Sequence, residues 1–299
     1  MSRRYAILCP GQGGQHPAMF VMSDGATDLP LPADLAQILH DPVRLFSNRL
    51  AQPLVVAAGL SRWEAIRSLI PAPDLIAGYS VGELTAYGVA GALPSASLVA
   101  LAAERAMLMD ACVDPHAPHR MLAISGLMRH SLAPMLLAHH LFVAIDNGAD
   151  RLVVGGLASR SGDIESTVMV LGGTCQRLPV AVASHTPLML GAATGFAAAL
   201  AAQPWRTASV PVLSGIGAAK VTDVAMAQTT LVAQLSQTIL WQDCLDACVE
   251  NGIGVTLELG PGDALSRMMR ARHPQVESRS IDSFRSIDGA ASWLKRQIA

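Results

Sequence analysis

Aromatic and charged residues are scarce in this chain of 299 residues. They make up 4% and 15% of it, whereas 51% of the residues are hydrophobic. Such a hydrophobic share is enough for a large buried core. Most of it is alanine, leucine and valine, which suits helices packed closely on a parallel sheet. The length favours one large domain that carries a smaller insertion.

Several classes of protein are disfavoured by what is missing. The formal net charge is only −2, which argues against a nucleic-acid partner. The five cysteines are scattered, and no further His or Cys pair completes a zinc site with Cys244 and Cys248, so we expect no metal. The longest apolar stretch, residues 189–202, is shorter than the roughly 20 residues that span a bilayer. With no secretory signal visible at the start, we expect a cytoplasmic protein without a membrane partner.

Two patterns of strands and helices alternate along the chain. Residues 120–179 follow the order βαββαβ, which is that of a ferredoxin-like unit. On both sides of it, buried strands alternate with helices. We therefore predict an α/β fold: a large α/β-hydrolase-like domain with a parallel sheet (1–118 and 181–299) and a small inserted ferredoxin-like (βαββαβ) domain (119–180). A strand-like segment is predicted at 178–183, followed by helices at 187–202 and 229–251 and strands at 210–214 and 255–259.

A G-x-S-x-G pattern, Gly78-Tyr79-Ser80-Val81-Gly82, joins a predicted strand to a predicted helix. A serine on such a sharp turn has a strained backbone, and its neighbours two residues away need to be nearly free of side chain. The turn presents the hydroxyl at a helix N-terminus, where the amide of Val81 can hold a developing oxyanion. The pattern predicts that Ser80 is a nucleophile. A plain glycine-rich turn is the alternative.

A serine nucleophile needs a base, and the chain has nine histidines. His185 follows the predicted strand 178–183 and precedes a helix that starts at Pro187. It is therefore predicted to lie at the C-terminal end of a strand, where α/β sheets hold their active sites. Position favours His185 as the base, with a buried structural histidine as the alternative.

Four short motifs occur in an order that resembles one known family. They are Pro10-Gly11-Gln12-Gly13-Gly14-Gln15, Gly78-Tyr79-Ser80-Val81-Gly82-Glu83, Ser184-His185-Thr186-Pro187-Leu188-Met189 and Gly260-Pro261-Gly262. They resemble the PGQGxQ, GHSxGE, SHxxxM and GPG segments of the malonyl-CoA:acyl carrier protein transacylases. The motifs cover nearly the whole chain, and this family also has a ferredoxin-like insertion.

The resemblance implies a role for each of seven residues. Ser80 would be the nucleophile, His185 the general base, and the backbone amides of Gln12 and Val81 the oxyanion hole. Arg105 would hold the free carboxylate of the acyl group, Asn147 would be an active-site asparagine, and the backbone carbonyl of Asn251 would orient the histidine.

Arg105 matters most for the substrate. A guanidinium forms two parallel hydrogen bonds to a carboxylate, so it suits a malonyl group and has no partner in an acetyl group. The alternative is a surface arginine beside Glu104. The mostly apolar residues around it leave little polar surface and favour the substrate role.

The implied reaction is ping-pong transfer of a malonyl group from malonyl-CoA to the phosphopantetheine-type thiol of an acyl carrier protein. Coenzyme A thioester would be a substrate, and no cofactor would be bound permanently. Tyr79 stands where the family usually has histidine. The compact chain resembles the transacylase (epsilon) subunit of malonate decarboxylase more than a fatty-acid enzyme, and the other subunits of that complex would then be partners. Two alternatives are a transacylase of fatty-acid or polyketide synthesis and a serine esterase or thioesterase, which would use the same serine and histidine.

Overall fold

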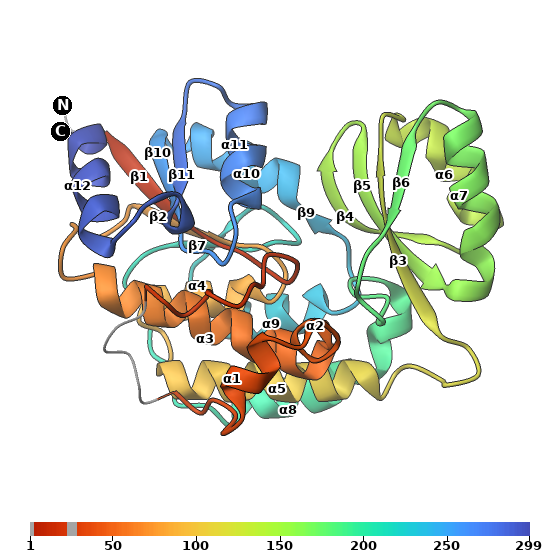
Figure 1. Cartoon of the computed structure of the whole chain (residues 1–299), viewed down its shortest axis with the longest axis horizontal. Helices are drawn as coiled ribbons and strands as arrows, with labels where there is room; N and C mark the ends of the chain where they lie inside the picture. Colours follow the sequence, from red (N-terminus) through yellow and green to blue (C-terminus); the bar gives the residue numbers. More distant parts are fainter. Residues whose placement is uncertain (1–2, 23–28) are drawn as a thin grey trace.

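The computed structural model describes residues 3–22 and 29–299 and has an α/β fold with two sheets (Figure 1). The larger sheet has the strand order β11-β10-β1-β2-β7-β8. Its first five strands are parallel, as predicted, but β8 pairs antiparallel with β7 at the edge. The strands are β1 (Arg4–Cys9), β2 (Leu75–Gly78), β7 (Val212–Leu213), β8 (Lys220–Val221), β10 (Ile253–Glu258) and β11 (Glu277–Ser280).

The smaller sheet has the order β6-β3-β5-β4-β9. Its first four strands are antiparallel, and with helices α6 (Arg129–Ala138) and α7 (Ser161–Val170) they follow the predicted βαββαβ order. The fifth strand was not predicted: β9 pairs in parallel with β4 and comes from outside residues 119–180. The strands are β3 (His119–Ser125), β4 (Phe142–Gly148), β5 (Arg151–Leu157), β6 (Thr174–Arg177) and β9 (Ile239–Leu240).

Three predicted elements differ in the structure. The helix predicted at 229–251 is two helices, α9 (Val224–Gln234) and α10 (Trp241–Glu250), with β9 between them. The helix predicted at 187–202 is a 3₁₀ helix, Pro187–Ala192, followed by α8 (Ala193–Ala201). Residues 178–183 form no strand. The other helices are α1 (Leu35–Leu39), α2 (Pro42–Phe46), α3 (Asn48–Ile66), α4 (Gly82–Val89), α5 (Ser95–Asp110), α11 (Ala264–Arg272) and α12 (Ile287–Ile298).

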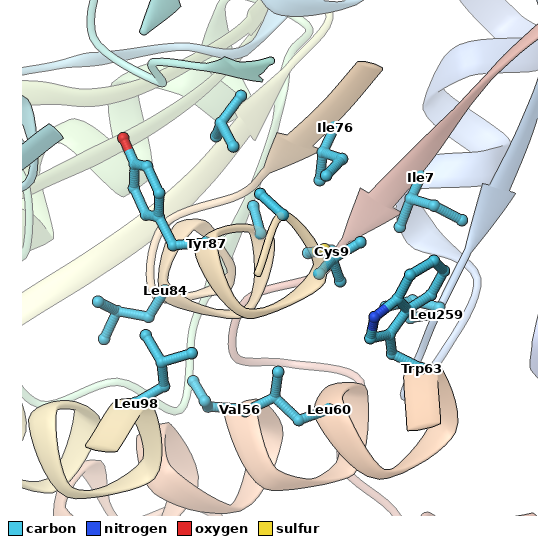
Figure 2. Close-up of a cluster of buried hydrophobic side chains, with 14 of the residues drawn as sticks. Ile7, Cys9, Val56, Leu60, Trp63, Ile76, Leu84, Tyr87, Leu98 and Leu259 are labelled. Atoms are coloured by element: carbon cyan, nitrogen blue, oxygen red, sulfur yellow. The ribbon is translucent and has the colours of Figure 1, made fainter. Parts of the chain in front are cut away.

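The larger sheet is buried on both faces. Alternate residues of β1 enter two hydrophobic cores: Ile7 and Cys9 join one, while Ala6 and Leu8 join the other. The first core lies between the sheet and helices α3, α4 and α5, and Figure 2 shows part of it around Tyr87. The second core includes apolar residues of α10 and α11. Helix α4 is therefore enclosed between the sheet and other helices, which fixes the position of the residues just before it.

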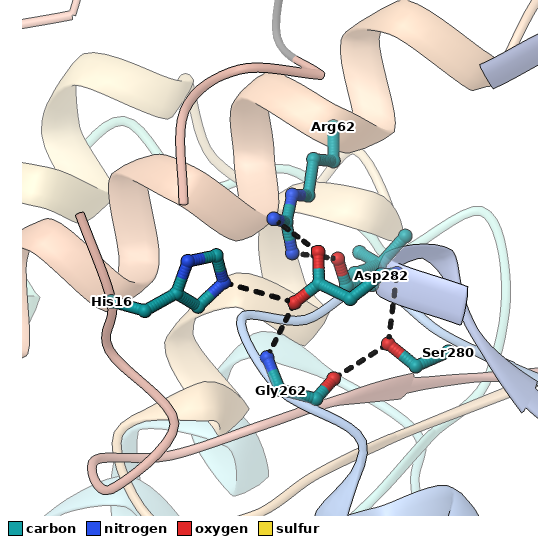
Figure 3. Close-up of polar contacts among 6 residues, drawn as sticks. His16, Arg62, Gly262, Ser280 and Asp282 are labelled. Carbon is teal, nitrogen blue, oxygen red and sulfur yellow. Dashed lines mark hydrogen bonds and ion pairs between the residues drawn. The ribbon is translucent and has the colours of Figure 1, made fainter. Parts of the chain in front are cut away.

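A polar cluster ties the loop after β10 to helix α3 and to the loop after β1 (Figure 3). Arg62 of α3 donates to Asp282 Oδ1 (2.6 Å) and to the Leu259 carbonyl (2.9 Å). The other carboxylate oxygen, Oδ2, accepts from the Gly262 amide (2.6 Å) and lies 3.3 Å from His16 Nε2. Because the Arg62 side chain is only 1% exposed, Asp282 supplies the countercharge that its burial requires.

No described helix, in residues 3–22 and 29–299, is long and apolar enough to cross a membrane.

Replacing Asp282 tests the importance of this cluster. Asp282→Ala should lower the free energy of unfolding by about 3–5 kcal/mol, because it leaves a buried guanidinium unpaired. Urea denaturation at neutral pH measures the change. Glu64→Ala is the matched control, since it breaks an exposed ion pair with Arg67 on the same helix and should cost less than about 1 kcal/mol. Equal losses of unfolding free energy in the two variants would show that the buried ion pair stabilises the fold no more than an exposed one.

Candidate active site

The loops that follow neighbouring parallel strands meet at one edge of the larger sheet. Cys9, the last residue of β1, lies opposite Gly78, the last residue of β2. Gln12 and Ser80 come three and two residues later and line the same cleft. Open α/β sheets hold their ligands at this carboxyl edge. The sequence prediction for these two residues therefore agrees with where the structure places them.

Ser80 has a left-handed backbone conformation, with φ of 56°. Such a conformation is strained for a residue with a side chain and is kept only where the surroundings enforce it. The flanking glycines are required by close approach. A methyl group on Gly82 would collide with the carbonyl oxygens of Cys9 and Pro10, and one on Gly78 would collide with the backbone of Glu83. The turn thus places Ser80 two residues before the first residue of α4.

His185 also has a left-handed conformation, with φ of 61°. Its Nε2 lies 2.8 Å from Ser80 Oγ. The prediction that this histidine lies at the end of a strand is wrong. Strand β6 ends at Arg177, and His185 occupies a turn just before the 3₁₀ helix. The turn is held by a hydrogen bond from the His185 amide to the carbonyl of Leu235 (2.8 Å), just past the end of α9.

The imidazole is oriented by Gln234 and not by Asn251. His185 Nδ1 lies 2.6 Å from the backbone carbonyl oxygen of Gln234. A carbonyl oxygen can only accept, so Nδ1 carries the proton and Nε2 is free to accept from Ser80. The Asn251 carbonyl instead accepts from Arg4, the first residue of β1 (2.7 Å). The assignment of Asn251 from family position is therefore corrected.

The environment of His185 keeps its ring neutral. The side chain is only 1% exposed. Burial, and then the positive charge of Arg105, lower the pKa of His185 to about 3. The Gln234 carbonyl acts in the opposite direction, since it accepts from the protonated ring nitrogen. At neutral pH the imidazole is therefore uncharged and available as a proton acceptor.

Arg105 of α5 is buried, at 2% exposure, and is not a surface residue beside Glu104. It donates to the side-chain oxygens of Gln52 on α3 (2.6 Å) and Gln234 (3.3 Å). Burial lowers the pKa of Arg105 to about 10, and the nearby carboxylate of Glu83 opposes this shift. The guanidinium therefore stays charged at neutral pH. Sequence reasoning gave no role to Gln52, Gln234 or Glu83, which come from three different helices.

A cleft of about 610 Å³ lies over these residues, between the two sheets. Gln12 and Ser80 line it from loops of the larger sheet, His185 from the turn before the 3₁₀ helix, and Asn147 from β4 of the smaller sheet. Asn147 Oδ1 is buried and has no hydrogen-bond partner among the residues that the structure describes, so it can accept from a ligand. Val81 and Arg105 are not among the described residues that line the cleft. Both are buried.

Tyr79 closes one side of the cleft. Its ring meets that of Trp241 edge-on, with the ring centres 5.1 Å apart. Burial raises the pKa of Tyr79 to about 12, although the nearby Asn147 acts in the opposite direction. The phenol is therefore neutral and can donate a hydrogen bond.

Within residues 3–22 and 29–299, no group of three or more His, Cys, Asp or Glu side chains is arranged to hold a metal ion.

Comparison with known proteins accounts for this arrangement. The sequence pattern of the acyl transferase domain family matches residues 33–287. This chain belongs to that family. The prediction of an acyl-transferring enzyme is thereby confirmed.

Named relatives cover nearly all of this acyl transferase. It is 31% identical to the malonyl CoA-acyl carrier protein transacylase of Mycobacterium bovis, over 96% of this chain and 99% of that protein. It is also 31% identical, over 82% of its length, to a segment that makes up 4% of a polyketide synthase from Streptomyces halstedii. The solved malonyl CoA-acyl carrier protein transacylase of Coxiella burnetii has a TM-score of 0.89 at 25% identity and matches 100% of this chain and 99% of that one.

The buried state of His185 leads to a direct test. The ring should stay neutral from about pH 8 down to about pH 5, whereas an ordinary histidine titrates near 6.5. NMR titration of the histidine Cε1–H resonances measures this, and the resonance of His185 is the one that is lost in His185→Gln. A midpoint near 6.5 for that resonance would contradict the description of the site.

Proposed function

We propose that this acyl transferase moves a malonyl group from coenzyme A to the thiol of an acyl carrier protein, through an ester on Ser80. The observation that carries the proposal is the 2.8 Å contact between Ser80 Oγ and a neutral, oriented His185. The name of the full-length relative from M. bovis supports both the malonyl donor and the carrier acceptor.

The proposed chemistry has two symmetric halves. His185 Nε2 accepts the proton of Ser80 as Oγ attacks the thioester carbonyl. The tetrahedral intermediate collapses when the C–S bond breaks, and the imidazolium returns the proton to the sulfur of coenzyme A. The carrier thiol then repeats these steps on the ester: it gives its proton to Nε2 as its sulfur attacks, and Ser80 leaves with that proton. No net proton is gained or lost.

The oxyanion is held, in this proposal, by the backbone amides of Gln12 and Val81. Two observations support this. Gln12 lines the cleft beside Ser80, and Val81 is the residue directly before α4, where amides of the first turn have no partner within the helix. The positive end of the helix dipole also favours a developing negative charge there. Loss of one such donor raises the barrier by roughly 3 kcal/mol.

The free carboxylate of the malonyl group is proposed to bind Arg105. A guanidinium has five N–H groups, and only two are used by Gln52 and Gln234, so donors remain for a carboxylate. These two amides also fix the plane of the guanidinium, which prepares it for a bidentate contact. Asn147 of the smaller sheet and Tyr79, which is next to Ser80, are proposed to contact the rest of the acyl group.

The pathway that fits best is fatty-acid or polyketide synthesis. The relatives named above are full-length transacylases and a segment of a polyketide synthase, and these support that pathway over a role in malonate decarboxylase. Hydrolysis by an esterase is also less consistent with the site. The buried Arg105 has N–H groups beyond those that bond to Gln52 and Gln234, and an uncharged ester would offer them no carboxylate.

We also propose that the two sheets belong to two domains. Residues 1–118 and 181–299 would form an α/β-hydrolase-like domain, and residues 119–180 a ferredoxin-like one. The strand order β6-β3-β5-β4 and a separate hydrophobic core behind this smaller sheet support the division. The cleft would then lie at a domain boundary, which gives a carrier arm a route to Ser80.

Trapping the ester tests the nucleophile. After brief incubation with malonyl-CoA, intact-mass spectrometry should detect one malonyl adduct on the wild-type protein and none on Ser80→Ala. Ser184→Ala is the matched control, because Ser184 also lines the cleft, and it should keep the adduct. An adduct on Ser80→Ala would show that another residue is acylated.

Replacing Arg105 tests the substrate. Arg105→Gln should lower the ratio of kcat/KM for malonyl-CoA to that for acetyl-CoA by roughly 10- to 100-fold, which corresponds to one charged hydrogen-bonded contact. Arg49→Gln, an exposed arginine on α3, serves as the control and should leave the ratio unchanged. The same ratio in both variants would remove Arg105 from substrate recognition.

A further inference from the structure

Glu83 is a fully buried carboxyl group next to the candidate active site. It lies in the first turn of α4, three residues after Ser80, and is 0% exposed. Its Oε2 accepts hydrogen bonds from the Gly215 amide (3.0 Å) and from Gln234 Nε2 (2.5 Å). Burying a carboxyl group is costly, so a chain that does so needs a compensating interaction. The positive end of α4 and the nearby Arg105 provide part of it.

Gln234 connects Glu83 to both groups of the proposed mechanism. Its backbone oxygen holds His185 Nδ1 (2.6 Å), and its side-chain oxygen accepts from Arg105 Nη2 (3.3 Å). Its side-chain nitrogen donates to Glu83. The orientation of this amide follows from Arg105: a guanidinium can only donate, so it faces the side-chain oxygen of Gln234 and leaves the amide nitrogen to donate to Glu83. A rotated amide would face a donor with a donor and an acceptor with an acceptor.

We infer that Glu83 is a positioning residue for acyl transfer, which acts by anchoring the side chain of Gln234 and so aligns His185 and Arg105 together. The inference rests on the proposed function of those two residues. Without the hydrogen bond to Glu83, Gln234 at the end of α9 is free to shift. His185 and Arg105, which both bond to Gln234, then lose their alignment. Misplacement by about 1 Å is enough to cost on the order of 100-fold in rate.

The hydrogen bonds of Glu83 allow its acceptor role to be separated from its charge. Both donors converge on Oε2, whereas Oε1 has no hydrogen-bond partner among the described residues. A glutamine can therefore keep its oxygen at the Oε2 position and place its amide nitrogen at the position of Oε1. Glu83→Gln keeps both contacts, while Glu83→Leu removes them at similar size.

Kinetics of four variants test the inference. Glu83→Leu and Gln234→Met should each lower kcat with acetyl-CoA on the order of 100-fold, because His185 loses its alignment. Each should also lower the preference for malonyl-CoA, because Arg105 loses its partner. The double variant should be no worse than either single one, since both changes break the same connection. Glu83→Gln should stay within about threefold of the wild type, because both hydrogen bonds remain.

Three outcomes would overturn the inference. They are additive losses in the double variant, a loss in Glu83→Gln as large as that in Glu83→Leu, and an unchanged malonyl preference in a folded Gln234→Met protein. Circular dichroism establishes folding, and the Glu83→Gln and Gln234→Met arms decide the question if Glu83→Leu does not fold. Failure of the proposed function is a separate result, because the wild-type protein itself would then form no malonyl ester on Ser80.

Discussion

The interruption between α9 and α10 is the constraint on which the site depends. In a continuous helix, the carbonyl of Gln234 would accept from the amide four residues later. Because α9 ends at Gln234, this oxygen is free, and His185 Nδ1 bonds to it at 2.6 Å. That contact fixes the tautomer and turns Nε2 toward Ser80. The same interruption lets residues 239–240 leave as β9 and join the smaller sheet, so one break in the chain both orients the base and links the two sheets.

The local parts of the site could be predicted because their signals are local. The glycines on either side of Ser80 are needed because any side chain at their positions would collide with the backbone. The order of the motifs indicates the family whose sequence pattern matches residues 33–287. Hydrophobic alternation along β1 and the βαββαβ order of the smaller sheet likewise depend on neighbours in the sequence. These features account for the α/β fold and for the placement of Gln12 and Ser80 at one edge of the larger sheet.

The rest depends on contacts between distant elements. Residues 235–240 contain neither glycine nor proline, so nothing in their pattern marks the end of α9, and one helix was predicted over 229–251. The carbonyl that orients His185 was assigned from the family resemblance to Asn251, at the end of α10, whereas the structure has Gln234 in this role. Glu83 shows the same limit. It belongs to a recognised motif, but its partners Gly215 and Gln234 are more than 130 residues away.

We propose that one buried network prepares Ser80, His185 and Arg105 for a malonyl group. A crystal structure of the wild-type enzyme, frozen shortly after exposure to malonyl-CoA, tests it most directly. We expect an ester on Ser80 Oγ, the free carboxylate paired with the Arg105 guanidinium, and His185 Nδ1 still bonded to the Gln234 carbonyl. An ester whose carboxylate points to solvent, with Arg105 bonded only to Gln52 and Gln234, would contradict it.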